Sequence, residues 1–137
     1  MTGTPGIDYF VGGSGANPLS SLTGGIVYTG LDSSSSTESN EWHIVPVSMT
    51  FHHFYCAGPK SSDGATLTFT VDITTFSSGS ASTTAASTTC VIASGAVSGV
   101  STGAISISAG QAVDVSVTGG SVADPTTAGG VSWGLAP

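Results

Sequence analysis

The chain has 137 residues, which is enough for one domain that buries a core of its own. Only 7% of the residues are charged, against about 25% in ordinary globular domains, and the net charge is −7 because Lys60 is the single basic residue. Phosphate backbones and anionic membrane surfaces bind proteins through Lys and Arg, so this composition argues against nucleic-acid and membrane partners.

Residues 1–24 are rich in Gly, Pro, Ser and Thr and keep no hydrophobic period. Hydrophobic residues are nevertheless dotted along this segment. We therefore expect an extended N-terminal arm that contacts a partner through Ile7, Tyr9, Phe10 and Val11, followed by a domain over residues 25–137. A disordered terminus is the alternative.

The first part of the domain carries three short strand patterns. Residues 25–31 predict one strand, and the polar run LDSSSSTESNE predicts a loop after it. Residues 42–47 predict a second strand, which Pro46 confines to a sheet edge or a bulge. Residues 48–56 predict a third strand, and AGPKSSDGA predicts a turn.

The clearest strand pattern covers residues 67–73, where Leu, Phe, Val and Ile alternate with Thr and Asp. Strict period two indicates a strand with one buried face and one wet face. Residues 76–89 are dominated by Ser, Thr and Ala, and we expect a low-complexity loop there. A strand is expected around Cys90, whereas residues 96–103 are ambiguous.

The last third predicts two strands over AISISAGQAVDVSV, joined at Ala109 and Gly110, and a final strand over residues 131–135. The chain thus carries about eight short strands and no helical period. This pattern predicts an all-β antiparallel protein, but a sandwich, a barrel and a jelly roll all fit it.

The stretch MTFHHFYC contains the side chains best suited to metal binding or catalysis. In a regular strand His52 and His53 face opposite sides, so they share no metal ion unless a bulge intervenes. His52 and Cys56 share a face but lie about 13 Å apart, too far for one zinc ion. We expect strand histidines at an interface or in solvent. The alternative is a metal ion on a three-fold axis, bound by one histidine from each of three subunits.

Two cysteines, Cys56 and Cys90, are present, and the N-terminal sequence has neither the basic nor the apolar region of a signal peptide. We therefore expect two free buried thiols, with a disulfide as the alternative.

Other candidate motifs are weak. Gly99 to Gly103 match G-x-S-x-G around Ser101, but a strand pattern follows where a nucleophile elbow requires a helix. Asp32, Glu38 and Glu41 lie in one polar loop whose spacing fits no calcium motif, so solvated carboxylates are expected. We predict no catalytic, cofactor or metal residues. Trp133 is expected in the core, and Trp42 in the core, at an interface or in a sugar site.

Four stretches together carry a resemblance. They are SSSSTESNEWHIVPVSMTF, LTFTVDI, TTCVIASGAVSG and ISISAGQAVDVSVTGG. Their order resembles a group of small phage and bacterial structural proteins whose fold is similar to the tumour-necrosis-factor-like jelly roll and which assemble as trimers. The resemblance covers about residues 31–135. It departs at the FSSGSASTT run, where the group carries a charged turn.

The resemblance implies an antiparallel jelly-roll sandwich and a structural role in a virion. Members serve as capsid cement or decoration proteins, as fibre knobs, or as C-terminal modules. No heptad or collagen-like shaft precedes the domain here, so we expect a non-enzymatic cement protein. It would bind the major capsid protein as a homotrimer on the outer surface of the capsid. The alternatives are a receptor- or glycan-binding knob that uses Trp42, Tyr55 and the SSSSTESNE loop, and, in another class, a small esterase based on Ser101.

Overall fold

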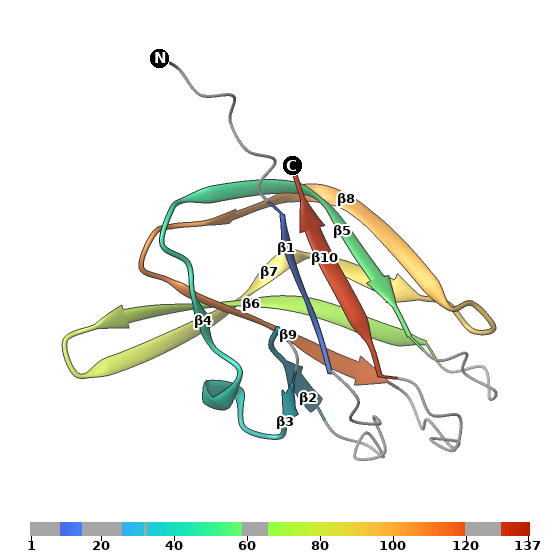
Figure 1. The fold of residues 1–137 in the computed structure, drawn as a ribbon, viewed down its shortest axis with the longest axis horizontal. Helices are drawn as coiled ribbons and strands as arrows, with labels where there is room; N and C mark the ends of the chain where they lie inside the picture. The colour runs from blue at the N-terminus through green and yellow to red at the C-terminus, as the bar shows by residue number, and fades with distance from the viewer. Residues whose placement is uncertain (1–8, 15–25, 32, 59–65, 120–129) are drawn as a thin grey trace.

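The computed structural model describes residues 9–14, 26–31, 33–58, 66–119 and 130–137, and it is a sandwich of two antiparallel β-sheets (Figure 1). The elements in chain order are β1 (Phe10–Gly13), β2 (Ile26–Thr29), β3 (Ser34–Ser35), the 3₁₀ helix η1 (Glu38–Asn40), β4 (His43–Ile44), β5 (Met49–Ala57), β6 (Leu67–Ser77), β7 (Ser80–Ile92), β8 (Ser98–Ile107), β9 (Ala112–Gly119) and β10 (Ser132–Ala136). None of the described segments forms a helix long and apolar enough to cross a membrane.

The strand order is that of a jelly roll. One sheet, called sheet A below, has the order β1-β10-β5-β8, and the other, sheet B, has the order β3-β2-β9-β6-β7, with β4 also pairing with β9. The chain crosses repeatedly from one sheet to the other, so strands close in sequence mostly lie in different layers. The all-β sandwich prediction is confirmed: in the described ranges, eight strands have four residues or more, and β3 and β4 have two each.

The core lies between the two sheets and is built by the alternating residues of the long strands. In β6 and β9, Phe69 lies beside Val117, and Val71 lies beside Val115, on the inner face. Each such side chain contributes about 1.5–3 kcal/mol when it leaves water. Trp133 is the largest side chain of the core, and the largest of the completely buried ones are Phe51, Phe54, Phe69, Leu67, Ile105, Ile107 and Leu135.

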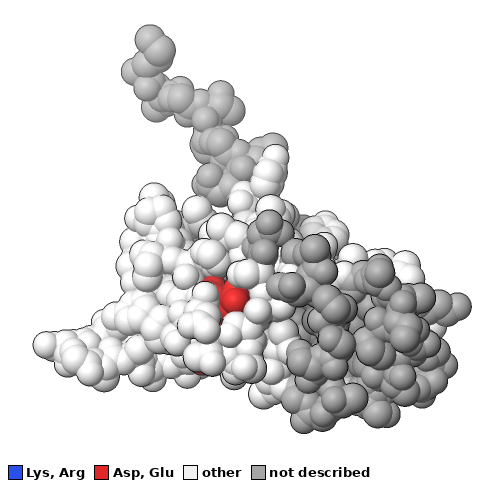
Figure 2. All heavy atoms as spheres, turned by 60° about the horizontal axis from the view of Figure 1, so that its bottom comes forward, with Lys and Arg blue, Asp and Glu red and all other residues white. Residues whose placement is uncertain are grey.

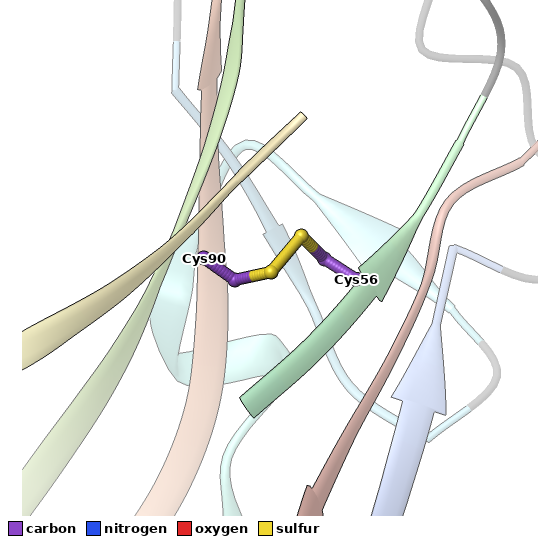
Figure 3. Close-up of a disulfide and its surroundings, with 2 residues drawn as sticks. All are labelled: Cys56 and Cys90. Atoms are coloured by element: carbon purple, nitrogen blue, oxygen red, sulfur yellow. A yellow bond between two sulfur atoms is a disulfide. The ribbon is translucent and has the colours of Figure 1, made fainter. Parts of the chain in front are cut away.

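A disulfide joins the two sheets across this core. Cys56 of β5 and Cys90 of β7 are bonded, with their Cα atoms 6.1 Å apart (Figure 3). Both residues are buried. The expectation of free thiols is therefore wrong. Two inward strand positions on facing sheets bring the sulfur atoms together, and only the pairing of the sheets reveals this.

A long hairpin made by β6 and β7 replaces the loop expected over residues 76–89. Ser77 pairs with Ser80 around a two-residue turn, and Gly79 occupies the positive-φ position with φ 81°. The hairpin projects beyond the body of the sandwich (Figure 1), because β9 pairs with β6 only as far as Thr74. Its outer half is exposed on both faces, so no hydrophobic alternation marks it in the sequence.

Two further segments differ from their expected extent. The ambiguous residues 96–103 belong largely to β8, which begins at Ser98. Of the strand expected over 42–47, only His43 and Ile44 pair with β9. The chain leaves the sheet before Pro46, whose ring nitrogen could donate no ladder hydrogen bond.

Part of the expected N-terminal arm is an edge strand of the sandwich. In β1, Phe10 pairs with Leu135 of β10 and stacks on Trp133 with ring centroids 5.9 Å apart. Gly12 lies so close to the Trp133 ring and to the carbonyl of Gly30 that a Cβ atom would clash with both. Residues 9–14 are thus tied to the domain expected over 25–137, while 1–8 and 15–24 lie outside the described residues.

Candidate functional site

A register shift between β5 and β8 determines on which face of the sheet the histidine side chains of β5 lie. The register with β8 shifts between Phe51 and His53, so Phe51, Phe54 and Cys56 all face the core. A regular strand would have placed Phe51 and Phe54 on opposite faces. His52 and His53 instead both lie on the outer side, because the alternation of β5 is interrupted at this register shift.

The three histidines have different surroundings. His52 is exposed, the Nδ1 atom of His53 lies 3.0 Å from the carbonyl oxygen of Pro137, and the Nε2 atom of His43 accepts a hydrogen bond from the backbone N–H of Leu31. Among the described residues, no three His, Cys, Asp or Glu side chains stand close enough to hold a metal ion.

The outer face of sheet A carries no charge. None of its four strands contains Asp, Glu, Lys or Arg. Instead it exposes apolar and aromatic side chains, with Val11 61%, Tyr55 48% and Val100 60% exposed. An open groove of about 510 Å³ runs here between β10, β5 and β8, and its lining includes Tyr55, Val100 and Gly134. Charge depletion with exposed aromatic and aliphatic groups is typical of the centre of a protein interface.

The expected arm residues divide into three kinds. Tyr9 and Val11 are exposed and stand beside the outer face of sheet A. Phe10 is partly buried and packs on the core. Ile7 lies outside the described residues. The structure therefore places Tyr9 and Val11 where a partner can reach them, and it gives Phe10 a role in holding β1.

Ser101 lies within β8, opposite Phe54 of β5, and is not at a strand-to-helix turn. The nucleophile elbow needs that turn to present the hydroxyl at the end of a sheet. The geometry of the G-x-S-x-G motif therefore provides no oxyanion hole at a helix N-terminus, and we make no catalytic assignment.

A pair of acidic side chains faces outward from the centre of sheet B. Asp72 of β6 and Asp114 of β9 are directly opposite each other in the register. Cross-strand partners of this kind have Cβ atoms about 4.5–5.5 Å apart. Asp72 accepts hydrogen bonds from Ser116, whereas both carboxylate oxygens of Asp114 are buried without a partner.

Residues 33–42, here called the cover segment, begin at β3, the edge strand of sheet B, and continue through η1 to Trp42, close to the acid pair. They include β3, which pairs with β2, and η1, whose Glu38 acts electrostatically on Asp72 and Asp114. At the end of the segment, the Trp42 ring packs edge-on against Phe76 of β6 at 5.2 Å. Asp72 and Asp114 are consequently 8% and 0% exposed. On the face that Figure 2 presents, the described surface shows a small patch of acidic atoms and is otherwise mostly free of charged groups.

The electrostatics of the acid pair are dominated by burial. Burial, followed by the negative charges of Asp72, Glu38 and Glu41, raises the pKa of Asp114 to about 8. Burial likewise raises the pKa of Asp72, although its hydrogen bonds to Ser116 oppose the shift. Removing a carboxylate from water favours its neutral form, and a second carboxylate nearby does the same.

The expectation of solvated loop carboxylates is only partly met. Glu41 is buried and accepts a hydrogen bond from the Ser33 hydroxyl, and the Oε1 atom of Glu38 is buried without a partner. Asp32 lies outside the described residues. Sequence reasoning missed Asp72 and Asp114, although each is the only acidic residue in an alternating strand. Their partnership depends on strand pairing, which alternation does not specify.

The two tryptophans and Tyr55 do not form one surface. Trp133 is buried and donates a hydrogen bond from Nε1 to the hydroxyl of Thr29, 3.0 Å away. Trp42 belongs to the cover segment over sheet B, whereas Tyr55 lies on the outer face of sheet A. A glycan site that combines Trp42 and Tyr55 would therefore have to span both sheets.

No protein-family model, no curated protein and no solved structure matches this chain. The fold and the two surfaces described above define it as a jelly-roll β-sandwich protein with one charge-free face and one covered acidic face.

Proposed function

We propose that this protein is a non-enzymatic structural subunit of a virion, a capsid cement protein that binds the major capsid protein as a homotrimer. The observation that carries the proposal is the charge-free outer face of sheet A, with Val11, Tyr55 and Val100 exposed on it. No described segment covers this face, whereas the cover segment lies on sheet B. An apolar face of this kind favours contact with copies of the same chain or with a shell.

The disulfide and the small number of charges also support a particle-surface location. Disulfides persist in oxidising surroundings outside cells, and Cys56–Cys90 ties the two sheets together where a released particle would be exposed. A trimer would bring three copies of one weak contact to a shell, and each contact after the first is intramolecular.

The self-association step is tested by measuring mass in solution. We expect the purified protein to have the mass of a trimer in light scattering and sedimentation equilibrium. Val100→Asp, on β8 at one edge of the charge-free face, should give a folded monomer because an unpaired carboxylate would be buried between copies. Val47→Asp is the matched control: Val47 is 61% exposed, against 60% for Val100, but lies in the loop after β4. A wild-type monomer, or a Val100→Asp trimer, would contradict this interface.

The arm is tested by a deletion that preserves β1. Removing residues 1–8 leaves Phe10 on Trp133 and leaves the pairing of β1 with β10 intact. We expect the truncated protein to stay folded and trimeric but to bind heads lacking this protein at least tenfold more weakly, as measured by co-sedimentation. Unchanged binding would remove residues 1–8 from the contact. A deletion to residue 22 would also remove β1 and would confuse binding with folding.

The receptor- or glycan-binding knob remains the second candidate. Exposed Tyr55 beside the groove on sheet A is the feature that favours it. A glycan array separates the two proposals, since a cement protein should bind capsid shells and should bind none of the glycans on the array.

A further inference from the structure

Among the described residues, no Lys or Arg side chain accompanies the acid pair between the cover segment and sheet B. Asp114 is surrounded by Asp72 from β6, by Glu38 and Glu41 from the cover segment, and by Tyr28 from β2. The pKa of Tyr28 is itself raised, first by burial and then by the charge of Glu38. The chain has one basic residue, Lys60, and it lies outside the described residues.

The nearest histidine does not supply the missing positive charge. His43, on β4 beside β9, uses Nε2 to accept the N–H of Leu31, which a protonated ring nitrogen could not do. The described part of the molecule also lacks three metal-ligating side chains close enough to enclose an ion. The described residues thus leave a proton from solvent as the group that neutralises this buried carboxylate.

The unsatisfied polar atoms point to the same place. In the described residues, the buried side-chain oxygen and nitrogen atoms without a partner are Oδ1 and Oδ2 of Asp114, Oε1 of Glu38 and Nε1 of Trp42. The first two belong to the sheet, and the others belong to the segment that covers it. A buried carboxylate with no donor is costly when ionised and far less costly when neutral.

We propose that the cover segment is a proton-dependent lid: residues 33–42 close over sheet B while Asp114 carries a proton and loosen when that proton is lost. Ionised Asp114 would stand directly opposite Asp72 and close to Glu38 and Glu41. The sheet residues are fixed by their ladders, whereas the cover segment is held by β3, two residues long, by the hydrogen bond from Ser33 to Glu41 and by the Trp42 contact. Repulsion therefore moves the lid and leaves the sheet intact.

The direction of the pH effect follows from the raised pKa of Asp114. Its value of about 8 in the folded protein lies above the ordinary value of 3.8. The folded state therefore holds the proton more tightly than the unfolded chain. The stability that this proton provides is fully present at acid pH and is lost as the pH rises from about 4 to about 8. Above that range a closed lid would bury the negative charge of Asp114.

The two tryptophans allow the lid and the core to be observed separately. The chain has two indoles, Trp42 in the cover segment and Trp133 in the core. We expect amide and indole NMR spectra recorded from about pH 6 to about pH 9.5 to show the Trp42 N–H shifting and broadening around pH 8. The Trp133 N–H, bonded to Thr29, should stay unchanged.

Asp114→Asn is the decisive variant, because it keeps the shape of the side chain and removes the titration. The Trp42 signal should then be independent of pH, and the melting temperature should exceed that of the wild type by several degrees at about pH 9 but match it near pH 4. Asp72→Asn is the second variant and should move the Trp42 midpoint to lower pH, because one repelling charge is removed.

Three results would overturn the proposal. The first is a pH-independent Trp42 signal in the wild type. The second is a transition that survives in both Asn variants. The third is a rise in wild-type melting temperature with millimolar Ca²⁺ that Asp114→Asn abolishes, since a metal ion would then take the place assigned to the proton.

Discussion

Replacing Cys56 and Cys90 together by alanine is expected to lower the free energy of unfolding by about 4 kcal/mol at 25 °C. The bond closes a loop with a sequence separation of 34, and the entropy that it removes from the unfolded chain grows with that length. Loss of the two buried sulfur atoms adds a smaller packing cost, because both sites are enclosed by the core.

Urea unfolding followed by tryptophan fluorescence measures this change. The wild-type protein unfolded with reductant should match the double variant, and the wild type unfolded without reductant should show no reactive thiols. Two reactive thiols, together with equal stability of variant and wild type, would show that the cysteines are not bonded in the folded protein.

Trp133→Ala is expected to cost about 3–5 kcal/mol, the range for a large aromatic removed from a core. The ring of Trp133 is 3% exposed, stacks on Phe10 and fills the space beside Gly12. Its N–H donates to the hydroxyl of Thr29, which donates in turn to the carbonyl of Val115 at 3.0 Å. One side chain of sheet A thus connects β1 to two strands of sheet B.

Thr29→Val separates the hydrogen bonds from the packing. The substitution keeps the shape of the side chain but leaves the buried indole N–H without an acceptor. The free energy of unfolding should therefore fall by about 1–3 kcal/mol. Trp42→Ala is the matched aromatic control, and it should cost less because Trp42 is partly exposed and contacts Phe76 at the surface. Equal costs for the two tryptophan variants would contradict a central position for Trp133.

The parts of the fold that could be predicted from sequence are the strands with one apolar face and one polar face. Residues 67–71 and 113–117 alternate strictly, and both lie in central strands of sheet B with their apolar residues inward. Trp133 was placed in the core by the same reasoning. Where a strand is wet on both faces, as in the outer part of the β6–β7 hairpin, no alternation is required and none appears.

The rest depended on contacts between distant strands. The register shift at Phe51 to His53 interrupts the alternation of β5 and cannot be seen in that stretch alone. The disulfide and the Asp72–Asp114 pair each unite residues from different strands, so register had to be known first. For the candidate site, charge depletion was visible in the composition, but its concentration over all of sheet A required the topology.

The tip of the β6–β7 hairpin has a practical consequence. Ser78 and Gly79 are exposed, the space around Gly79 is open, and the turn stands away from the body of the sandwich. Exposed turns of this kind accept inserted sequence with little effect on the folded body. A foreign epitope grafted between these two residues would be held outward by a two-stranded stalk, and a particle coated with such a protein would carry it as a dense, ordered antigen array.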